Sequence, residues 1–150
     1  MRSRAAGIAA GLATATSAFL PWFRDRAGRC TPCRAGDIPA LVLFRYVNRA
    51  PAVKLAHLAV ALGLTLVIAS LLPALLRAAG TLVVGTLVLA GVAAFTAQMI
   101  HESTNSHAGS AATHLGVGVL VAALGGLLAL TSSALAFAGA NAIEHDDEEI

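Results

Sequence analysis

Cys30 and Cys33 are the two cysteines of this 150-residue chain, and two residues separate them. This C-x-x-C spacing lets two sulfur atoms meet in a disulfide or bind one metal ion. Arg34 follows the pair, where covalent haem attachment would use a histidine. The motif therefore leaves three alternatives: a metal site, a redox-active dithiol, and a structural or incidental pair.

Histidines in the connecting segments could complete a metal site with these cysteines. Two thiolates and two imidazoles form a tetrahedral ligand set suited to Zn²⁺. The three connector histidines, His101, His107 and His114, are spaced by six and seven residues. This is wider than the three to five common in zinc motifs, so solvated loop histidines are the alternative. The candidate zinc ligands are Cys30, Cys33, His101 and His107, with His57 and His114 as substitutes.

Catalytic motifs are absent from the sequence. It has no Gly-rich phosphate loop, no carboxylate pair at catalytic spacing and no nucleophile motif. Glu102, beside His101, could relay protons at a membrane boundary, but a carboxylate there is equally stable in water. We therefore expect a protein that is not an enzyme, with no catalytic residue to assign.

Two uncharged runs, residues 55–76 and 78–100, dominate the chain. They are 22 and 23 residues long, and Arg77 alone separates them. A helix of about 20 mainly apolar residues crosses a bilayer, so the runs predict a transmembrane hairpin that turns at residues 77–80. Pro73 is expected to kink or loosen the end of the first run.

The N-terminal segment has two interpretations. It is either a cleaved signal peptide, with residues 13–15 as the cleavage site, or a retained first span with Trp22 as an interfacial anchor. We favour the retained span because the apolar stretch before Ala15 is short for a signal peptide. Gly7 and Gly11 form a G-x-x-x-G pair that would let another helix approach closely, as in a dimer.

These segments predict an all-α fold, an integral membrane four-helix bundle. Asp37 is expected to cap a short interfacial helix over about residues 38–49 in the first loop. Gly118, Ala122 and Gly126 form a small-residue stripe suited to close helix packing. The predicted spans are about 5–23, 54–76, 79–100 and 114–138, within a single domain of residues 1–143 that is followed by an acidic tail, 144–150.

An even number of spans places both termini on one side of the membrane. Seven Lys and Arg lie in residues 24–54, against three on the opposite side. The positive-inside rule therefore predicts that residues 24–54 and 101–113 are cytoplasmic and that the termini are outside. The N-terminal Met-Arg-Ser-Arg argues for the reverse orientation. In either case the hairpin brings the cysteines and the connector histidines to the same side.

The leading functional hypothesis is a small non-enzymatic protein of the cell membrane. It would be an accessory, scaffold or assembly subunit that packs in the lipid bilayer with other membrane proteins or with its own copies. The arginines favour anionic lipid over nucleic acid. One alternative is a metal-binding or thiol-redox membrane protein that uses Cys30 and Cys33. Another is an oligomeric transporter or channel lined by Thr65, Ser70, Thr86, Thr96 and Gln98.

Overall fold

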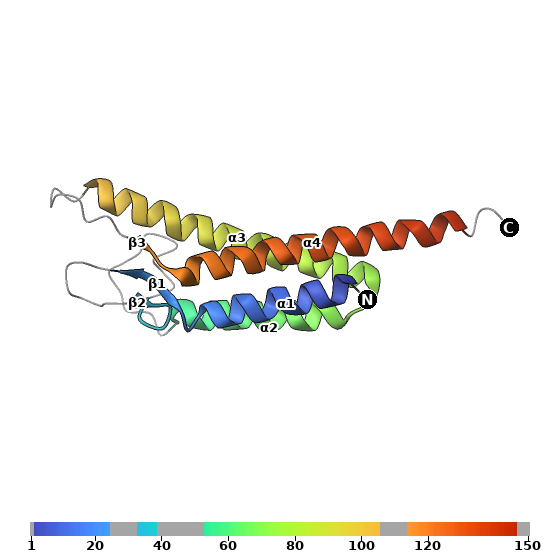
Figure 1. Cartoon of the computed structure of the whole chain (residues 1–150), viewed down its shortest axis with the longest axis horizontal. Coiled ribbons are helices and arrows are strands. Elements are labelled where there is room, and N and C mark those ends of the chain that lie inside the picture. Colours follow the sequence, from blue (N-terminus) through green and yellow to red (C-terminus); the bar gives the residue numbers. More distant parts are fainter. Residues whose placement is uncertain (1, 25–32, 39–52, 106–113, 147–150) are drawn as a thin grey trace.

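The computed structural model describes residues 2–24, 33–38, 53–105 and 114–146. This part of the chain forms four helices arranged up and down, so that both termini lie at one end and three short strands at the other (Figure 1). The sequence predicted an all-α fold; the four helices are confirmed, but the described residues also form a small sheet, so the fold is mostly helical. The elements are α1 (Arg2–Ser17), β1 (Pro21–Arg24), β2 (Cys33–Arg34), α2 (Leu55–Leu71), α3 (Ala74–Asn105), β3 (His114–Leu115) and α4 (Val117–Asp146).

The helices differ in how closely they pack against one another. Helix α1 lies between α2 and α4, and α4 in turn packs along α3. The remaining seam, between α2 and α3, is the least closely packed of the four. Among the described residues, Ala74–His101 in α3 and Val117–Gly139 in α4 are long and apolar enough to cross a membrane, whereas α2 is a shorter apolar helix.

The hairpin between α2 and α3 turns at Leu72 and Pro73, so the prediction of a turn at residues 77–80 is wrong. Proline has no N–H to continue a helix and disfavours helical backbone in the preceding residue. Accordingly Leu72 is extended, with ψ 165°, while the Pro73 carbonyl accepts a bond from the Arg77 N–H at 2.8 Å. Arg77 therefore lies in the first turn of α3 and not in a loop.

Helix α1 ends at Ser17, short of the predicted bound at residue 23. Residues 18–20 turn, and Pro21 begins β1. Trp22 is only 4% exposed, so it is not the interfacial anchor that the sequence suggested. Its indole N–H donates to the Ser17 carbonyl at 2.8 Å and so satisfies one of the free carbonyls at the end of α1.

The last two helices are longer than predicted. Helix α3 continues through Asn105 and α4 through Asp146, where the sequence suggested ends near residues 100 and 138. The interfacial helix predicted for residues 38–49 lies outside the described residues except for Ile38, which belongs to a turn. Asp37 accepts a bond from the Arg34 N–H at 3.0 Å within that turn.

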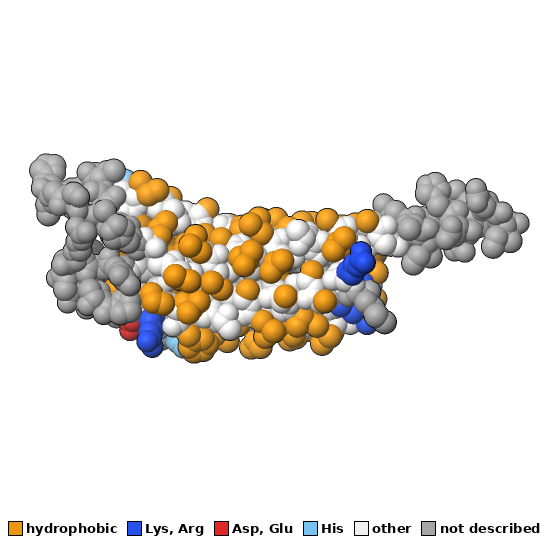
Figure 2. Space-filling view, viewed as in Figure 1, with side chains coloured by type: hydrophobic (Ala, Val, Ile, Leu, Met, Phe, Trp, Pro, Cys, Tyr) orange, Lys and Arg blue, Asp and Glu red, His pale blue; other side chains and the backbone are white. Residues whose placement is uncertain are grey.

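Small side chains fill the interior of the bundle, and large apolar ones cover its outside. Buried positions along the helices are mostly alanine, glycine, serine and threonine; Leu66 and Phe95 are the large fully buried exceptions. Exposed leucines occur on α2, α3 and α4. On the face shown in Figure 2, apolar and uncharged surface occupies the middle, while Lys and Arg lie at the two ends.

Glycines allow close approach at the helix crossings. A Cβ built on Gly63 would lie 2.6 Å from the Gly11 carbonyl oxygen, and one on Gly11 would lie 2.6 Å from the Gly63 oxygen. A Cβ on Gly126 would lie 3.3 Å from the Gly85 oxygen. The Gly11 face therefore packs against the chain's own α2, within the bundle.

Candidate functional site

Three strands close the end of the bundle away from the termini. They form an antiparallel sheet in the order β2-β1-β3. Phe23 in β1 pairs with Cys33 on one side and with Leu115 on the other, and Arg24 pairs with His114. The sheet therefore joins three segments that are distant in the sequence, and it places Cys33 and His114 on opposite sides of one central strand.

The turn after β2 caps the start of α2. The Leu55 N–H donates to the Ile38 carbonyl at 2.9 Å, and the Ala56 N–H donates to the Ala35 carbonyl at 3.1 Å. These bonds satisfy two amides of the first helical turn, which have no partner within the helix. The cysteine-bearing segment is thereby fixed to the helical bundle.

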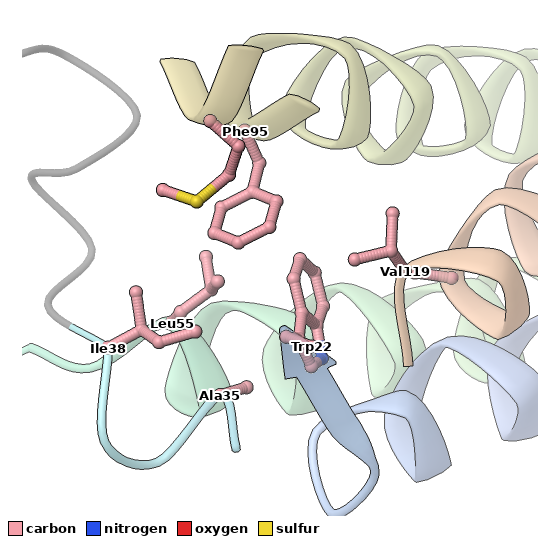
Figure 3. Close-up of a cluster of buried hydrophobic side chains, with 8 residues drawn as sticks. Trp22, Ala35, Ile38, Leu55, Phe95 and Val119 are labelled. Atoms are coloured by element: carbon pink, nitrogen blue, oxygen red, sulfur yellow. The ribbon is translucent and has the colours of Figure 1, made fainter. Parts of the chain in front are cut away.

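A cluster of buried apolar side chains lies beneath this sheet (Figure 3). The rings of Trp22 and Phe95 meet edge to face, with centroids 5.1 Å apart and planes at 86°, an arrangement that aromatic pairs favour. The cluster joins α3 and α4 to the strands and to the start of α2. Its members are Trp22, Ala35, Ile38, Leu55, Phe95, Met99, Val119 and Ala122.

Two glycines let the start of α4 pack against β1. A Cβ on Gly118 would lie 2.6 Å from the Trp22 ring, and one on Gly116 would overlap the Pro21 carbonyl. The Gly116 N–H donates to the Trp22 carbonyl at 2.7 Å. Gly118, which was predicted to pack closely against a helix, therefore packs against the Trp22 ring. Gly126 of the same stripe packs against α3.

Cys33 is fully buried and disulfide-bonded. Cys30, the chain's other cysteine, lies outside the described residues, as does His107. A cysteine binds a metal ion as its thiolate, and a disulfide sulfur at Cys33 does not provide one. No group of three or more His, Cys, Asp or Glu among the described residues could hold a metal ion. The four-ligand zinc site stays a prediction.

Three of the candidate histidines, His57, His101 and His114, occupy separate positions at this end of the bundle. His57 is exposed, and its Nδ1 accepts a bond from the Lys54 N–H at 3.0 Å, which caps the start of α2. His101 is exposed on α3, and His114 lies in β3. The sequence thus placed these residues at one end of the bundle, but it missed the capping role of His57.

An apolar cavity of about 410 Å³ lies in the seam between α2 and α3. Its lining includes Trp22 and Leu55 of the buried cluster, and it opens beside Gly91, where a built Cβ would meet nothing within 4 Å. The other lining residues come mainly from α2 and α3: Thr14, Ser17, Leu58, Ala59, Leu62, Leu87, Val88, Ala90, Val92, Ala94 and Ala122.

The polar groups in this cavity are already satisfied. The Thr14 hydroxyl donates to the Ala10 carbonyl at 2.9 Å, the Ser17 hydroxyl to the Thr14 carbonyl at 2.7 Å, and the Trp22 indole to the Ser17 carbonyl. None of the described residues that line the cavity is charged. The described part of its surface therefore suits an apolar occupant.

Comparisons with known proteins give no relative for this chain. Scans against protein-family models, curated proteins and solved structures find no match. Any function proposed for the chain therefore depends on its own residues and geometry.

Proposed function

We propose that the chain is an integral membrane protein whose four helices all span the bilayer. The distribution of side chains supports this. A water-soluble bundle would bury its leucines, whereas Leu64, Leu75 and Leu120 are each more than half exposed here. Small residues at helix contacts are typical of membrane bundles, in which close backbone approach replaces the hydrophobic driving force.

Within the membrane the protein acts as a non-enzymatic accessory or assembly subunit, and the α2–α3 seam receives a helix of a partner subunit. The observation that carries this proposal is the open space beside Gly91. The glycines at the other helix contacts pack against the chain's own atoms, as at Gly63 and Gly85. Ala90, Gly91 and Ala94 present a small-residue surface along the cavity, and such surfaces let a second helix approach closely.

Replacing Gly91 by leucine tests this proposal. The side chain fits the open space, and loss of a mid-helix glycine favours the helix by about 0.5–1 kcal/mol, so the variant should fold at least as well as wild type. We expect its partner to be lost in purification with a mild detergent. Ala134→Leu is the matched control, because Ala134 is exposed on α4 and does not line the cavity.

Two results would argue against the partner helix. One is a wild-type protein that purifies as a monomer carrying only phospholipid. The other is an equal yield of partner with the Gly91→Leu and Ala134→Leu variants. Crosslinking from a cysteine introduced at Ala90 would identify the occupant of the seam in intact membranes.

The disulfide at Cys33 bears on orientation. Disulfides persist in oxidising compartments and are rare in the cytosol. We therefore favour the orientation in which the strand-bearing end faces outside and the termini face the cytoplasm. The Lys and Arg count predicts the reverse, but the N-terminal Met-Arg-Ser-Arg agrees with the disulfide.

Thiol labelling in intact cells separates the two orientations. With a membrane-impermeant maleimide, we expect the wild-type chain to be labelled at cysteine only after treatment with an impermeant reductant. Arg4→Cys in a Cys30→Ser/Cys33→Ser background should be labelled only after the cells are permeabilised, because exposed Arg4 lies at the opposite end. Labelling of Arg4→Cys in sealed cells would support the charge-based orientation instead.

A further inference from the structure

A second pocket, of about 560 Å³, lies at the end of the bundle that carries the termini. Its lining residues belong to α1, α3 and α4, and these helices have ends on the side of the bundle opposite to the strands (Figure 1). Among the described residues that line it, two are arginines and none is acidic. The lining consists of Arg2, Ser3, Ala74, Arg77, Leu135, Ala136 and Gly139.

Arg77 is the unusual residue in this pocket. It is only 8% exposed, and its Nε is buried with no hydrogen-bond partner among the described residues. A buried polar group without a partner costs free energy, and the cost rises when the group is charged. A guanidinium at the end of a membrane helix therefore calls for an anion to bind it.

The walls of the pocket are held by hydrogen bonds between helices. The Ser132 hydroxyl donates to the Ser3 carbonyl at 2.7 Å, which ties α4 to α1. The Ser133 hydroxyl donates to the Ala78 carbonyl at 2.8 Å, which ties α4 to α3. The pocket is thus formed by fixed backbone and does not depend on surface side chains alone.

The backbone adds to the positive potential. Helices α1 and α3 both begin at this pocket, at Arg2 and Ala74. The first amides of a helix lack partners within it, and its dipole places partial positive charge at its N-terminus. Phosphate groups bind at such positions, and arginine pairs with their oxygens through two N–H groups.

From this arrangement we infer that the pocket binds a phosphate group, with Arg77 at its base and Arg2 at its mouth. The phosphate belongs either to an anionic phospholipid headgroup or to a free phosphate ion, since both present the same oxygens. The site is independent of the partner proposed for the α2–α3 seam, because it shares no residue with that cavity.

The test uses the purified full chain in detergent, with phosphatidylglycerol and inorganic phosphate as separate probes. Binding is measured by native mass spectrometry and by the shift in melting temperature. We expect Arg77→Gln to weaken binding by about tenfold or more, since an Arg–phosphate contact is charge-assisted. Arg4→Gln removes the same charge from an exposed position that does not line the pocket, and it should change binding by less than about twofold.

Arg2→Gln provides a second variant at the pocket mouth that leaves the bundle interior intact, and it should weaken binding by about threefold. Dependence on Arg77 with phosphatidylglycerol assigns the site to a lipid headgroup, and the same dependence with inorganic phosphate alone assigns it to the free ion. Equal binding by wild type and both pocket variants would overturn the inference. A second result would also overturn it: neutralising Glu144, Asp146 and Asp147 lowers the melting temperature of wild type but not of Arg77→Gln. The chain's own acids would then fill the pocket.

Discussion

Gly63→Leu is expected to destabilise the bundle by about 3 kcal/mol or more, the upper part of the range for overpacked interiors. The reason is geometric. A Cβ at this position would lie 2.6 Å from the Gly11 carbonyl oxygen and 2.7 Å from the Ala15 amide nitrogen. Both are backbone atoms, which cannot rotate away as a side chain can, so α1 and α2 would have to separate. Unfolding by a denaturing detergent, followed by circular dichroism, would measure the loss.

Gly91→Leu is the control for this change, because it makes the same substitution in the middle of a neighbouring helix. The space beside Gly91 is open, so this variant should be at least as stable as wild type. The two variants thus have effects of opposite sign. Equal stability for Gly63→Leu and wild type would contradict the close crossing of α1 and α2.

The helical class follows from the sequence because hydrophobicity over 20 or more residues is a strong and local signal. The turn between α2 and α3 was harder to locate. The turn was predicted at Arg77 because a charge interrupts the apolar run there. The backbone constraint of Pro73 instead determines where the turn lies. A charge at the membrane boundary can be buried in a pocket, but proline cannot donate the missing hydrogen bond.

The strands could not be predicted from the sequence. Strands β2 and β3 have only two residues each, too few to show an alternating pattern. Both pair with β1. That strand is distant from β3 in the sequence, and no hairpin signal adjoins it. Trp22 was consequently interpreted as a membrane anchor, although its place in β1 buries it in the protein interior.

The two pockets also could not be predicted from the sequence. Gly91 resembles the other glycines in the sequence, and only the arrangement of four helices reveals that nothing packs against it. Arg77 and Arg2 likewise line one pocket because α1 and α3 both begin at the same end of an up-and-down bundle. Each site depends on contacts between helices that are distant in the chain, which local patterns do not encode.

Trp22→Ala is expected to cost about 3–5 kcal/mol, the usual range for removing a large buried aromatic side chain. The substitution removes the edge-to-face contact with Phe95 and the indole bond to the Ser17 carbonyl. It also leaves empty space beside a cavity that already exists, which the fixed backbone around Gly118 cannot close. Unfolding in detergent would measure this loss. Phe19→Ala is the control, because Phe19 is 70% exposed and its loss should change stability by less than about 0.5 kcal/mol.

A second readout separates loss of this cluster from general weakening of the bundle. Cys33 pairs with Phe23, the residue next to Trp22 in β1, and it is fully buried in wild type. Trp22→Ala should therefore speed reduction of the disulfide by an added reductant, because the sheet loses its packing against α3 and α4. Gly63→Leu acts at a crossing of α1 and α2. We therefore expect it to lower the free energy of unfolding but to change the rate of disulfide reduction less. Equal rates of reduction in Trp22→Ala and wild type would show that the sheet is held independently of the aromatic cluster.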